Sequence, residues 1–286
     1  MIQTAPLPST DLRDIVASQA LWTRDAQWSA LFGGRTNSAW QVTDGSNALV
    51  LKLYRAHGDN PLFPNDPMAE AQMLRFLGDI DLAPQLVAEF DSRDGHCILY
   101  QAIPGKPWAE GTKAVAKMMQ KLHALPCPEN LRGVANGSDA IMAQAHRILA
   151  KCADTSLISP LRPKIEIAPS TDQALLHCDI VPGNLIENHQ GLFLIDWQCP
   201  AIGDPVEDIA IFLSPAMQTL YRGHPLSSEE RDTFLNNYRS QAARYEALAP
   251  AYHFRMAAYS QWQVERGFPD YAAGRDAEIT ALNAYL

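Results

Sequence analysis

The segment from residue 175 to residue 197, LLHCDIVPGNLIENHQGLFLIDW, concentrates polar side chains at the ends of apolar runs. Asp179 and Asn184 stand in the loop between two runs, and Asp196 follows the second run. A carboxylate in such a loop can accept a proton from an attacking hydroxyl. An amide oxygen and a second carboxylate are hard ligands, of the kind that Mg²⁺ takes together with substrate phosphates and water. The segment therefore predicts the parts for phosphoryl transfer, with Asp179 as base and Asn184 and Asp196 at a metal ion.

The first part of the chain, residues 1–103, carries the pattern of an antiparallel sheet. Short apolar runs alternate with turn signals, and the dipeptide Asp-Gly occurs twice between such runs, which is typical of hairpins. One stretch begins at Pro67 and ends at Gly78, the usual asymmetry of a helix. We expect five antiparallel strands and one helix here.

The second part, residues 104–286, is expected to be mainly helical. It follows a Pro- and Gly-rich hinge, PGKPW, at 104–108. Its first apolar face recurs at helical spacing from Val115 to Leu125. Further helices are predicted at 138–152, 228–247, 249–265 and 275–286, and residues 153–173 are expected to be irregular. Two short strands around the polar loop are expected to pair with one another as a hairpin.

Three motifs in this order carry a family resemblance. HCDIVPGN at 177–184 has the spacing H-x-D-x-x-x-x-N of a kinase catalytic loop, IDW follows twelve positions after the Asn, and GDPVEDIA occupies 203–210. Together they resemble the aminoglycoside phosphotransferase and choline kinase family, over residues 26–286. The resemblance implies an α+β, protein-kinase-like fold of two lobes. These are a small N-lobe at 1–103 and a larger, mainly helical C-lobe at 104–286.

The resemblance also implies a nucleotide site in the first part. Lys52 matches the lysine that pairs with the nucleotide phosphates, and Glu70 matches the glutamate that pairs with this lysine. A lysine on an apolar strand requires such a partner on general grounds as well, because burying an unpaired charge is costly. ATP and Mg²⁺ are the implied cofactors.

Two backbone segments complete the implied nucleotide site. The segment GGRTNS at 33–38 stands where the family covers the phosphates with backbone N–H groups, and Asn37 and Ser38 are the expected donors, together with Thr36. The adenine is expected to rest on backbone groups between Gln101 and Ile103.

Supporting roles are implied for two further residues. His177 is expected to organise the catalytic loop, and Asp208 to hold that loop through hydrogen bonds. Cys178 stands where protein kinases have an Arg that binds a phosphorylated loop, and no A-P-E segment follows. A protein substrate is therefore not expected, and Cys178 is interpreted as a small packing residue.

Composition excludes several classes of partner. The 286 residues carry a formal net charge of -9 and a pI of about 5.3, which argues against general nucleic-acid binding. No apolar run approaches a membrane span, and no obligate protein partner is evident. The five cysteines form no CxxC pair, and residues 1–14 lack the features of a secretory signal. A cytoplasmic protein is expected.

The predicted function is an ATP- and Mg²⁺-dependent kinase that acts on a small-molecule hydroxyl, with amino alcohols such as choline or ethanolamine as candidates. Thiamine, an aminoglycoside, homoserine and an amino sugar are alternative acceptors, and a nucleotide-binding pseudokinase and a metal-dependent hydrolase are alternative functions. Tyr252, Tyr259 and Trp262 form either a cation-binding cage or the core face of a helix.

Overall fold

The computed structural model describes residues 7–31, 36–55 and 60–286. The chain divides into two compact units. The first consists of residues 1–60, 64–106 and 193–199, and the second of residues 61–63, 107–192 and 200–286. The segment 193–199, which includes Asp196, therefore groups with the N-terminal sheet, whereas the sequence pattern placed it with the helical part.

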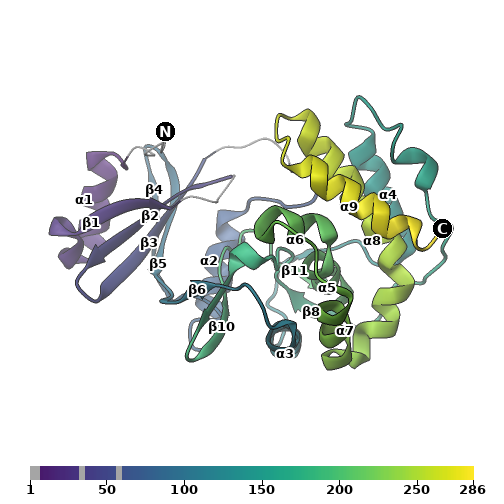
Figure 1. The fold of residues 1–286 in the computed structure, drawn as a ribbon. Coiled ribbons are helices and arrows are strands. Elements are labelled where there is room, and N and C mark those ends of the chain that lie inside the picture. Colours follow the sequence, from purple (N-terminus) through teal and green to yellow (C-terminus); the bar gives the residue numbers. More distant parts are fainter. Residues whose placement is uncertain (1–6, 32–35, 56–59) are drawn as a thin grey trace. The chain divides into compact units, whose positions relative to one another are not determined.

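The sheet of the first unit has five antiparallel strands in the order β1-β2-β3-β5-β4 (Figure 1). Their bounds are Gln27–Leu31 (β1), Ser38–Asp44 (β2), Asn47–Tyr54 (β3), Leu86–Ser92 (β4) and Gly95–Gln101 (β5). Gly45, with φ of 58°, supplies the left-handed residue of the turn between β2 and β3. The five-stranded antiparallel sheet predicted from the sequence is confirmed.

Two α-helices accompany this sheet. Helix α1, Thr10–Gln19, follows the N-cap Ser9 and buries Leu12 and Val16 in a core that β2, β3 and β5 also line. Helix α2, Pro67–Phe76, begins after Asp66, whose carboxylate accepts hydrogen bonds from two backbone N–H groups of its first turn. Helix α2 corresponds to the helix predicted from Pro67. It places Glu70 on its buried face.

The second unit is mainly helical, as predicted. Its α-helices have the bounds Thr112–His123 (α3), Ser138–Leu149 (α4), Val206–Leu213 (α5), Pro215–Arg222 (α6), Ser228–Asn237 (α7), Arg239–Glu265 (α8) and Tyr271–Asn283 (α9). Helices α4 and α9 both pack along α8 (Figure 1).

The predicted break between two helices, 228–247 and 249–265, is in the wrong place. Helix α8 continues through Pro250, and the break between helices falls at Tyr238 instead. A proline inside a helix removes one backbone hydrogen bond and costs about 3 kcal/mol. Nearly every residue of α8 from Tyr245 to Gln263 is buried, and we attribute the continuity of the helix to this burial, which outweighs the local cost.

The predicted hairpin around the catalytic loop is also wrong. Strand β8, Ala174–Leu176, pairs with β11, Ala201–Gly203, whereas β10, Gly191–Leu194, pairs with β9, Leu185–Asn188. A short turn between β9 and β10, in which Asn188 Oδ1 accepts from the N–H of Gln190, makes that local pairing available. The catalytic loop therefore connects strands of two different sheets. Short strands β6, Lys106–Pro107, and β7, Arg132–Gly133, complete these sheets.

Candidate active site

The catalytic loop of the second unit is anchored by one buried carboxylate. Asp208, on the first turn of α5, is completely buried. Its Oδ2 accepts from the N–H of His177 at 3.0 Å, and its Oδ1 accepts from the N–H of Cys178 at 2.7 Å. The hydrogen bonds that the resemblance implied for Asp208 are therefore present, and they fix the backbone immediately before Asp179.

Asp179 and Asn184 are joined across the loop. Asn184 Nδ2 donates to the backbone oxygen of Asp179 and to its Oδ2, both at 3.0 Å. The N–H of Asp179 donates to His177 Nδ1 at 3.2 Å. The role of His177 as organiser of the loop stays a prediction. Because both amide hydrogens of Asn184 point to Asp179, its Oδ1 remains as the atom suited to a cation.

Cys178 has the left-handed backbone conformation, with φ of 61°, and is 2% exposed. Burial raises the pKa of its thiol well above the ordinary value. A thiol held in the protonated form is a poor nucleophile, which agrees with its interpretation as a packing residue.

His123 is part of the same network, although the sequence analysis did not identify it. Its Nε2 lies 3.0 Å from Asp208 Oδ2, and its Nδ1 lies 2.6 Å from the Tyr238 hydroxyl. A carboxylate can only accept, so Nε2 donates to Asp208. The sequence did contain a sign of this role, because His123 is a polar residue at the end of the apolar face of α3. With His123, the buried carboxylate of Asp208 receives three donors.

Two further acidic residues of the GDPVEDIA motif are buried and form ion pairs with arginines. Asp204 accepts from the N–H of Val206 and pairs with Arg244 at 2.6 Å. Glu207 forms a bidentate pair with Arg255, at 2.6 and 3.0 Å, and both side chains are buried. The pair of Glu207 with Arg255 was also missed, and its signal was an arginine within the apolar stretch of α8.

In the first unit, Lys52 on β3 lies between two carboxylates. Its Nζ is 2.5 Å from Glu70 Oε2 and 2.5 Å from Asp196 Oδ1. The hydroxyl of Tyr54 also donates to Glu70 Oε2. The pairing of Lys52 with Glu70 that the sequence implied is present. Asp196, predicted only as a metal ligand, is a second partner of the lysine.

Burial and charge act on this cluster in opposite directions. Burial raises the pKa of Glu70 from 4.5 to about 7, against the opposing effect of the Lys52 ammonium group. Burial by itself would lower the pKa of Lys52. The negative charges of Asp196 and Glu70 have the larger combined effect, so the pKa of Lys52 is raised. Lys52 therefore stays protonated at neutral pH.

Asp196 follows the end of β10 in a left-handed conformation, with φ of 65°. The next residue, Trp197, is completely buried and donates from Nε1 to the backbone oxygen of Leu194 at 3.0 Å. This anchor keeps the Trp side chain in the core, while the Asp196 side chain keeps 27% of its surface exposed. The exposed part of the carboxylate is accessible to a ligand.

The segment before β2 is held by side-chain amides. Asn37 Nδ2 donates to Asn65 Oδ1 at 2.8 Å and to Gln198 Oε1 at 3.1 Å. Ser38 begins β2 and is paired with Leu53 of β3. Gly33 and Gly34, named with these residues as the phosphate-covering loop, lie outside the described residues.

The expected adenine-contacting backbone is partly engaged already. The N–H of Gln101 donates to the backbone oxygen of Gln85 at 2.9 Å, and the N–H of Ala102 donates to that of Ala48 at 3.0 Å. These two N–H groups are therefore used within the first unit. A contact of the adenine with Ile103 stays a prediction.

The predicted site residues fall into two sets. Lys52, Glu70 and Asp196 lie together in the first unit, and His177, Asp179, Asn184 and Asp208 lie together in the second. Within the described part of the chain, no cluster of three or more His, Cys, Asp or Glu side chains is arranged to hold a metal ion. The expected magnesium ligands are one amide and one carboxylate.

The three aromatic residues of α8 belong to the core. Tyr252, Tyr259 and Trp262 are 5%, 2% and 6% exposed. The guanidinium of Arg255 lies over the Tyr252 ring at 4.9 Å, and that of Arg266 lies over the Trp262 ring at 4.5 Å. The protein's own cations thus occupy these faces, which supports the interpretation as core residues over that of a cage.

The family follows from comparison with known proteins. The family model described as "Phosphotransferase enzyme family" matches residues 27–251. This chain belongs to the phosphotransferase enzyme family. The match confirms the family expected from the catalytic-loop motifs.

Solved structures share the fold. A choline/ethanolamine kinase family protein from Mesorhizobium loti has a TM-score of 0.67 and 14% identity, covering 96% of this chain and 92% of its own. A choline kinase from Cryptosporidium parvum has a TM-score of 0.65 and 18% identity, covering 96% and 94%. An aminoglycoside-3'-phosphotransferase of type VIII has a TM-score of 0.60 and 18% identity, covering 89% and 100%. These likenesses confirm the α+β, kinase-like fold.

A sequence relative matches only in part. Protein LicA of Haemophilus influenzae is 35% identical over 69 residues, which are 24% of this chain and 23% of LicA. The match therefore spans about a quarter of each protein. In the part of this phosphotransferase-family chain that the structure describes, no helix is long and apolar enough to cross a membrane.

Proposed function

We propose that this chain is a kinase that transfers the γ-phosphoryl group of ATP to a hydroxyl of a small molecule. The proposal rests on one observation. Asn184 is hydrogen-bonded to the carboxylate of Asp179, in a loop whose backbone is hydrogen-bonded to Asp208. Membership of the phosphotransferase enzyme family supports the same reaction class.

Asp179 is the proposed base. The acceptor oxygen forms a bond to the γ-phosphorus while the bond from that phosphorus to the β,γ-bridging oxygen breaks, and ADP leaves with that electron pair. The hydroxyl proton passes to Asp179 Oδ and then to solvent. The hydrogen bond from Asn184 fixes the Asp179 carboxylate, so the base is already oriented before the acceptor binds.

The donor set suits Mg²⁺. Asn184 Oδ1 and the partly exposed carboxylate of Asp196 are hard oxygen ligands, and Mg²⁺ takes one or two such groups together with phosphate oxygens and water. When bound, the ion would neutralise phosphate charge as it develops. We propose Asn184 and Asp196 as its protein ligands.

The remaining residues are proposed to bind the nucleotide or to support the loop. Lys52 would contact the phosphates, with Glu70 holding its ammonium group. Backbone groups of Asn37 and Ser38 would lie near the phosphates, and those of Gln101 and Ile103 near the adenine. His177 and Asp208 are positioning residues, because they act through the backbone of the catalytic loop.

The proposed function is to be tested with a panel of candidate acceptors, some of which are taken from similar structures. Choline and ethanolamine enter because similar structures are described as choline or ethanolamine kinases, and an aminoglycoside enters on the same ground. Thiamine, homoserine and an amino sugar complete the panel.

All five cysteines are free, and we propose a reducing, cytoplasmic location on that ground.

The test measures ADP release from Mg-ATP with each acceptor, together with the mass of the product. We expect release above the acceptor-free background with at least one compound, and a product that carries one added phosphoryl group. Asp179→Asn should lower kcat by about 10²–10⁴, whereas Asp172→Asn, an exposed carboxylate outside the loop, should leave it unchanged. Nucleotide binding without turnover on any acceptor would favour a pseudokinase instead.

A further inference from the structure

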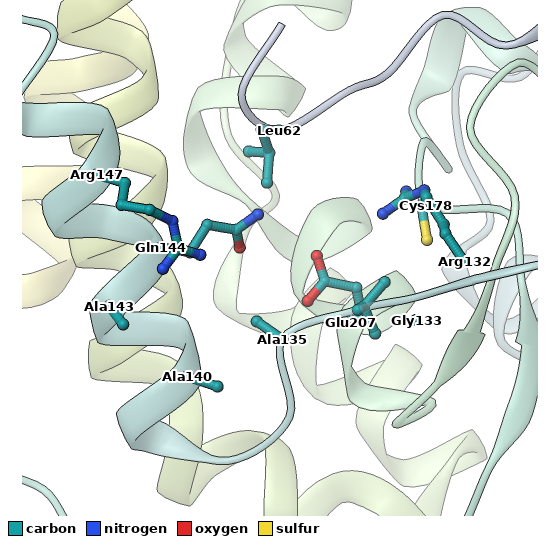
Figure 2. Close-up of a pocket in the computed structure, with 11 residues that line it drawn as sticks. Leu62, Arg132, Gly133, Ala135, Ala140, Ala143, Gln144, Arg147, Cys178 and Glu207 are labelled. Carbon is teal, nitrogen blue, oxygen red and sulfur yellow. The ribbon is translucent and has the colours of Figure 1, made fainter.

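The catalytic loop borders a cavity on one side. This cavity of about 260 Å³ lies beside α4 in the second unit, and Cys178 contributes to its lining. Figure 2 shows Gln144 and Arg147 of α4 on one side of the cavity and Cys178 on the other. Atoms that face a cavity lack packing partners in that direction. Packing therefore holds the loop at Cys178 less firmly from this side, and hydrogen bonds must contribute more.

The backbone of Cys178 is also in an unfavourable conformation. Its φ of 61° lies in the left-handed region, which residues other than Gly, Asn and Asp seldom adopt. Such a conformation persists where the surrounding contacts hold it. Here the N–H groups of His177 and Cys178 donate to the Asp208 carboxylate. The orientation of this carboxylate therefore fixes the backbone that leads into Asp179.

One oxygen of the Asp208 carboxylate is bonded to His123, the last residue of α3. Nε2 of His123 lies 3.0 Å from Asp208 Oδ2, and the two side chains are 4% and 0% exposed. An ionised carboxylate can only accept, so Nε2 carries a proton. In a neutral imidazole with its proton on Nε2, the other nitrogen, Nδ1, is an acceptor. A neutral His123 therefore supports Asp208 in this tautomer alone.

Tyr238 selects that tautomer. Its hydroxyl lies 2.6 Å from His123 Nδ1, and the residue is 4% exposed. Burial raises the pKa of Tyr238, and the negative charge of Asp208 raises it further, so the hydroxyl keeps its proton and donates to Nδ1. The hydrogen bond at one ring nitrogen decides which nitrogen carries the proton. Tyr238 thereby keeps the Nε2 proton of His123 directed at Asp208.

The side chains of this network come from three places in the second unit. Tyr238 stands where α7 ends and α8 begins, His123 ends α3, and Asp208 lies in the first turn of α5. The ring of Tyr238 also packs near that of Phe234, with centroids 6.4 Å apart. Removal of the hydroxyl alone therefore leaves the packing of the Tyr238 ring in place.

We infer that Tyr238 and His123 are positioning residues for the proposed base Asp179, and that they act through Asp208 and the backbone of the catalytic loop. The inference rests on the proposed function for its assignment to phosphoryl transfer. A base must be held close to its productive geometry, because a displacement of about 1 Å can lower the rate about 100-fold. Neither residue needs to contact a substrate for this role.

The first experiment measures kcat and KM with an acceptor that supports ADP release. His123→Leu removes the donor to Asp208 and should lower kcat about 100-fold. His123→Gln can still donate to the carboxylate and should keep more of the wild-type kcat. Tyr238→Phe leaves the tautomer of His123 unselected and should lower kcat about tenfold. In each variant kcat should change more than the KM for ATP, because Lys52 and Asp196 belong to the first unit.

Tyr245→Phe is the matched control. It also removes the hydroxyl of a buried tyrosine of α8, but the ring of Tyr245 lies against Arg231 instead of the catalytic-loop network. This variant should keep the wild-type kcat. Thermal denaturation compares the stability of all variants, and circular dichroism checks that each is folded. If His123→Leu fails to fold, Tyr238→Phe and His123→Gln carry the test.

The second experiment follows the loop without turnover. Amide hydrogen exchange, read on a peptide that spans residues 174–186, reports how often the loop opens. The N–H groups of His177 and Cys178 should exchange at least about tenfold faster in His123→Leu than in the wild type. Tyr245→Phe should leave their exchange unchanged.

The outcomes separate this inference from the proposed function. If the loop exchanges at the wild-type rate in His123→Leu, or if Tyr238→Phe has the same kcat as Tyr245→Phe, the inference is overturned. A His123→Leu variant with as much activity as His123→Gln would overturn it as well. If exchange rises as expected while the wild type releases no ADP with any acceptor, the network stands as the anchor of the loop. Its assignment to phosphoryl transfer is then overturned together with the proposed function.

Discussion

In the first unit a lysine is held by two carboxylates, whereas in the second unit a loop is held by backbone N–H groups bonded to one carboxylate. The Lys52 cluster depends on charge balance, because Lys52 and Glu70 are both buried and each neutralises the other. The catalytic loop depends on Asp208, which accepts from the backbone of His177 and Cys178. Backbone donors remain when a side chain is replaced, so the two regions should respond differently to substitution.

The largest effect is expected at Asp208. Asp208→Ala would leave two buried backbone N–H groups and the Nε2–H of His123 without their acceptor, and should lower the free energy of unfolding by about 3–5 kcal/mol. Asp208→Asn keeps one acceptor oxygen and should lower the free energy of unfolding by less. Urea denaturation measures both, with Asp172→Ala as a control that should change stability by about 0.5 kcal/mol or less. Equal losses in the Ala and Asn variants would argue against the hydrogen-bond account.

A smaller loss is expected at Lys52. Lys52→Met removes the counter-charge of Glu70 and Asp196, but Glu70 can take up a proton because its pKa is already raised. We expect a loss of about 2–3 kcal/mol at neutral pH. A double-mutant cycle with Glu70→Gln should show coupling, because the double variant leaves no buried charge at position 70. Additive losses would show that the pair does not act as a unit.

The smallest effect is a pH dependence at Glu70. Because the pKa of Glu70 is higher in the folded state than the unfolded value, the folded chain holds more protons between about pH 4.5 and 7. The stabilisation from this group is thus full below about pH 4.5 and is lost as the pH rises through about 7. The free energy of unfolding of the wild type minus that of Glu70→Gln should therefore fall by about 2 kcal/mol from pH 5 to pH 7.5. A difference that rises over this range would contradict the assignment.

The sequence predicted the parts of this molecule that depend on local pattern. The Asp-Gly turns and apolar runs gave the antiparallel sheet, and the catalytic-loop motif gave Asp179 and Asn184. Hydrogen bonds between Asp208 and the catalytic loop were expected from the family resemblance of the GDPVEDIA motif, but the two backbone N–H groups that make them were not named in advance.

Other features depend on contacts that no local pattern specifies. Strand β8 pairs with β11, which lies 25 residues further along the chain, and that choice is made by tertiary packing. The continuity of α8 through Pro250 likewise follows from burial, which propensity does not include. The cavity beside α4 brings that helix together with strand β7, and neither segment carries a motif.

The central claim is that Asp179 serves chemistry while Asp196 serves the nucleotide, and one paired measurement tests it. Calorimetry gives the Kd of Mg-ADP, and ADP release gives kcat, for wild type, Asp179→Asn and Asp196→Ala. We expect Asp179→Asn to keep the wild-type Kd while kcat falls about 10²–10⁴, and Asp196→Ala to weaken Mg-ADP binding about 100-fold or more. Near-full turnover in Asp179→Asn, or unchanged Mg-ADP affinity in Asp196→Ala, would contradict the account.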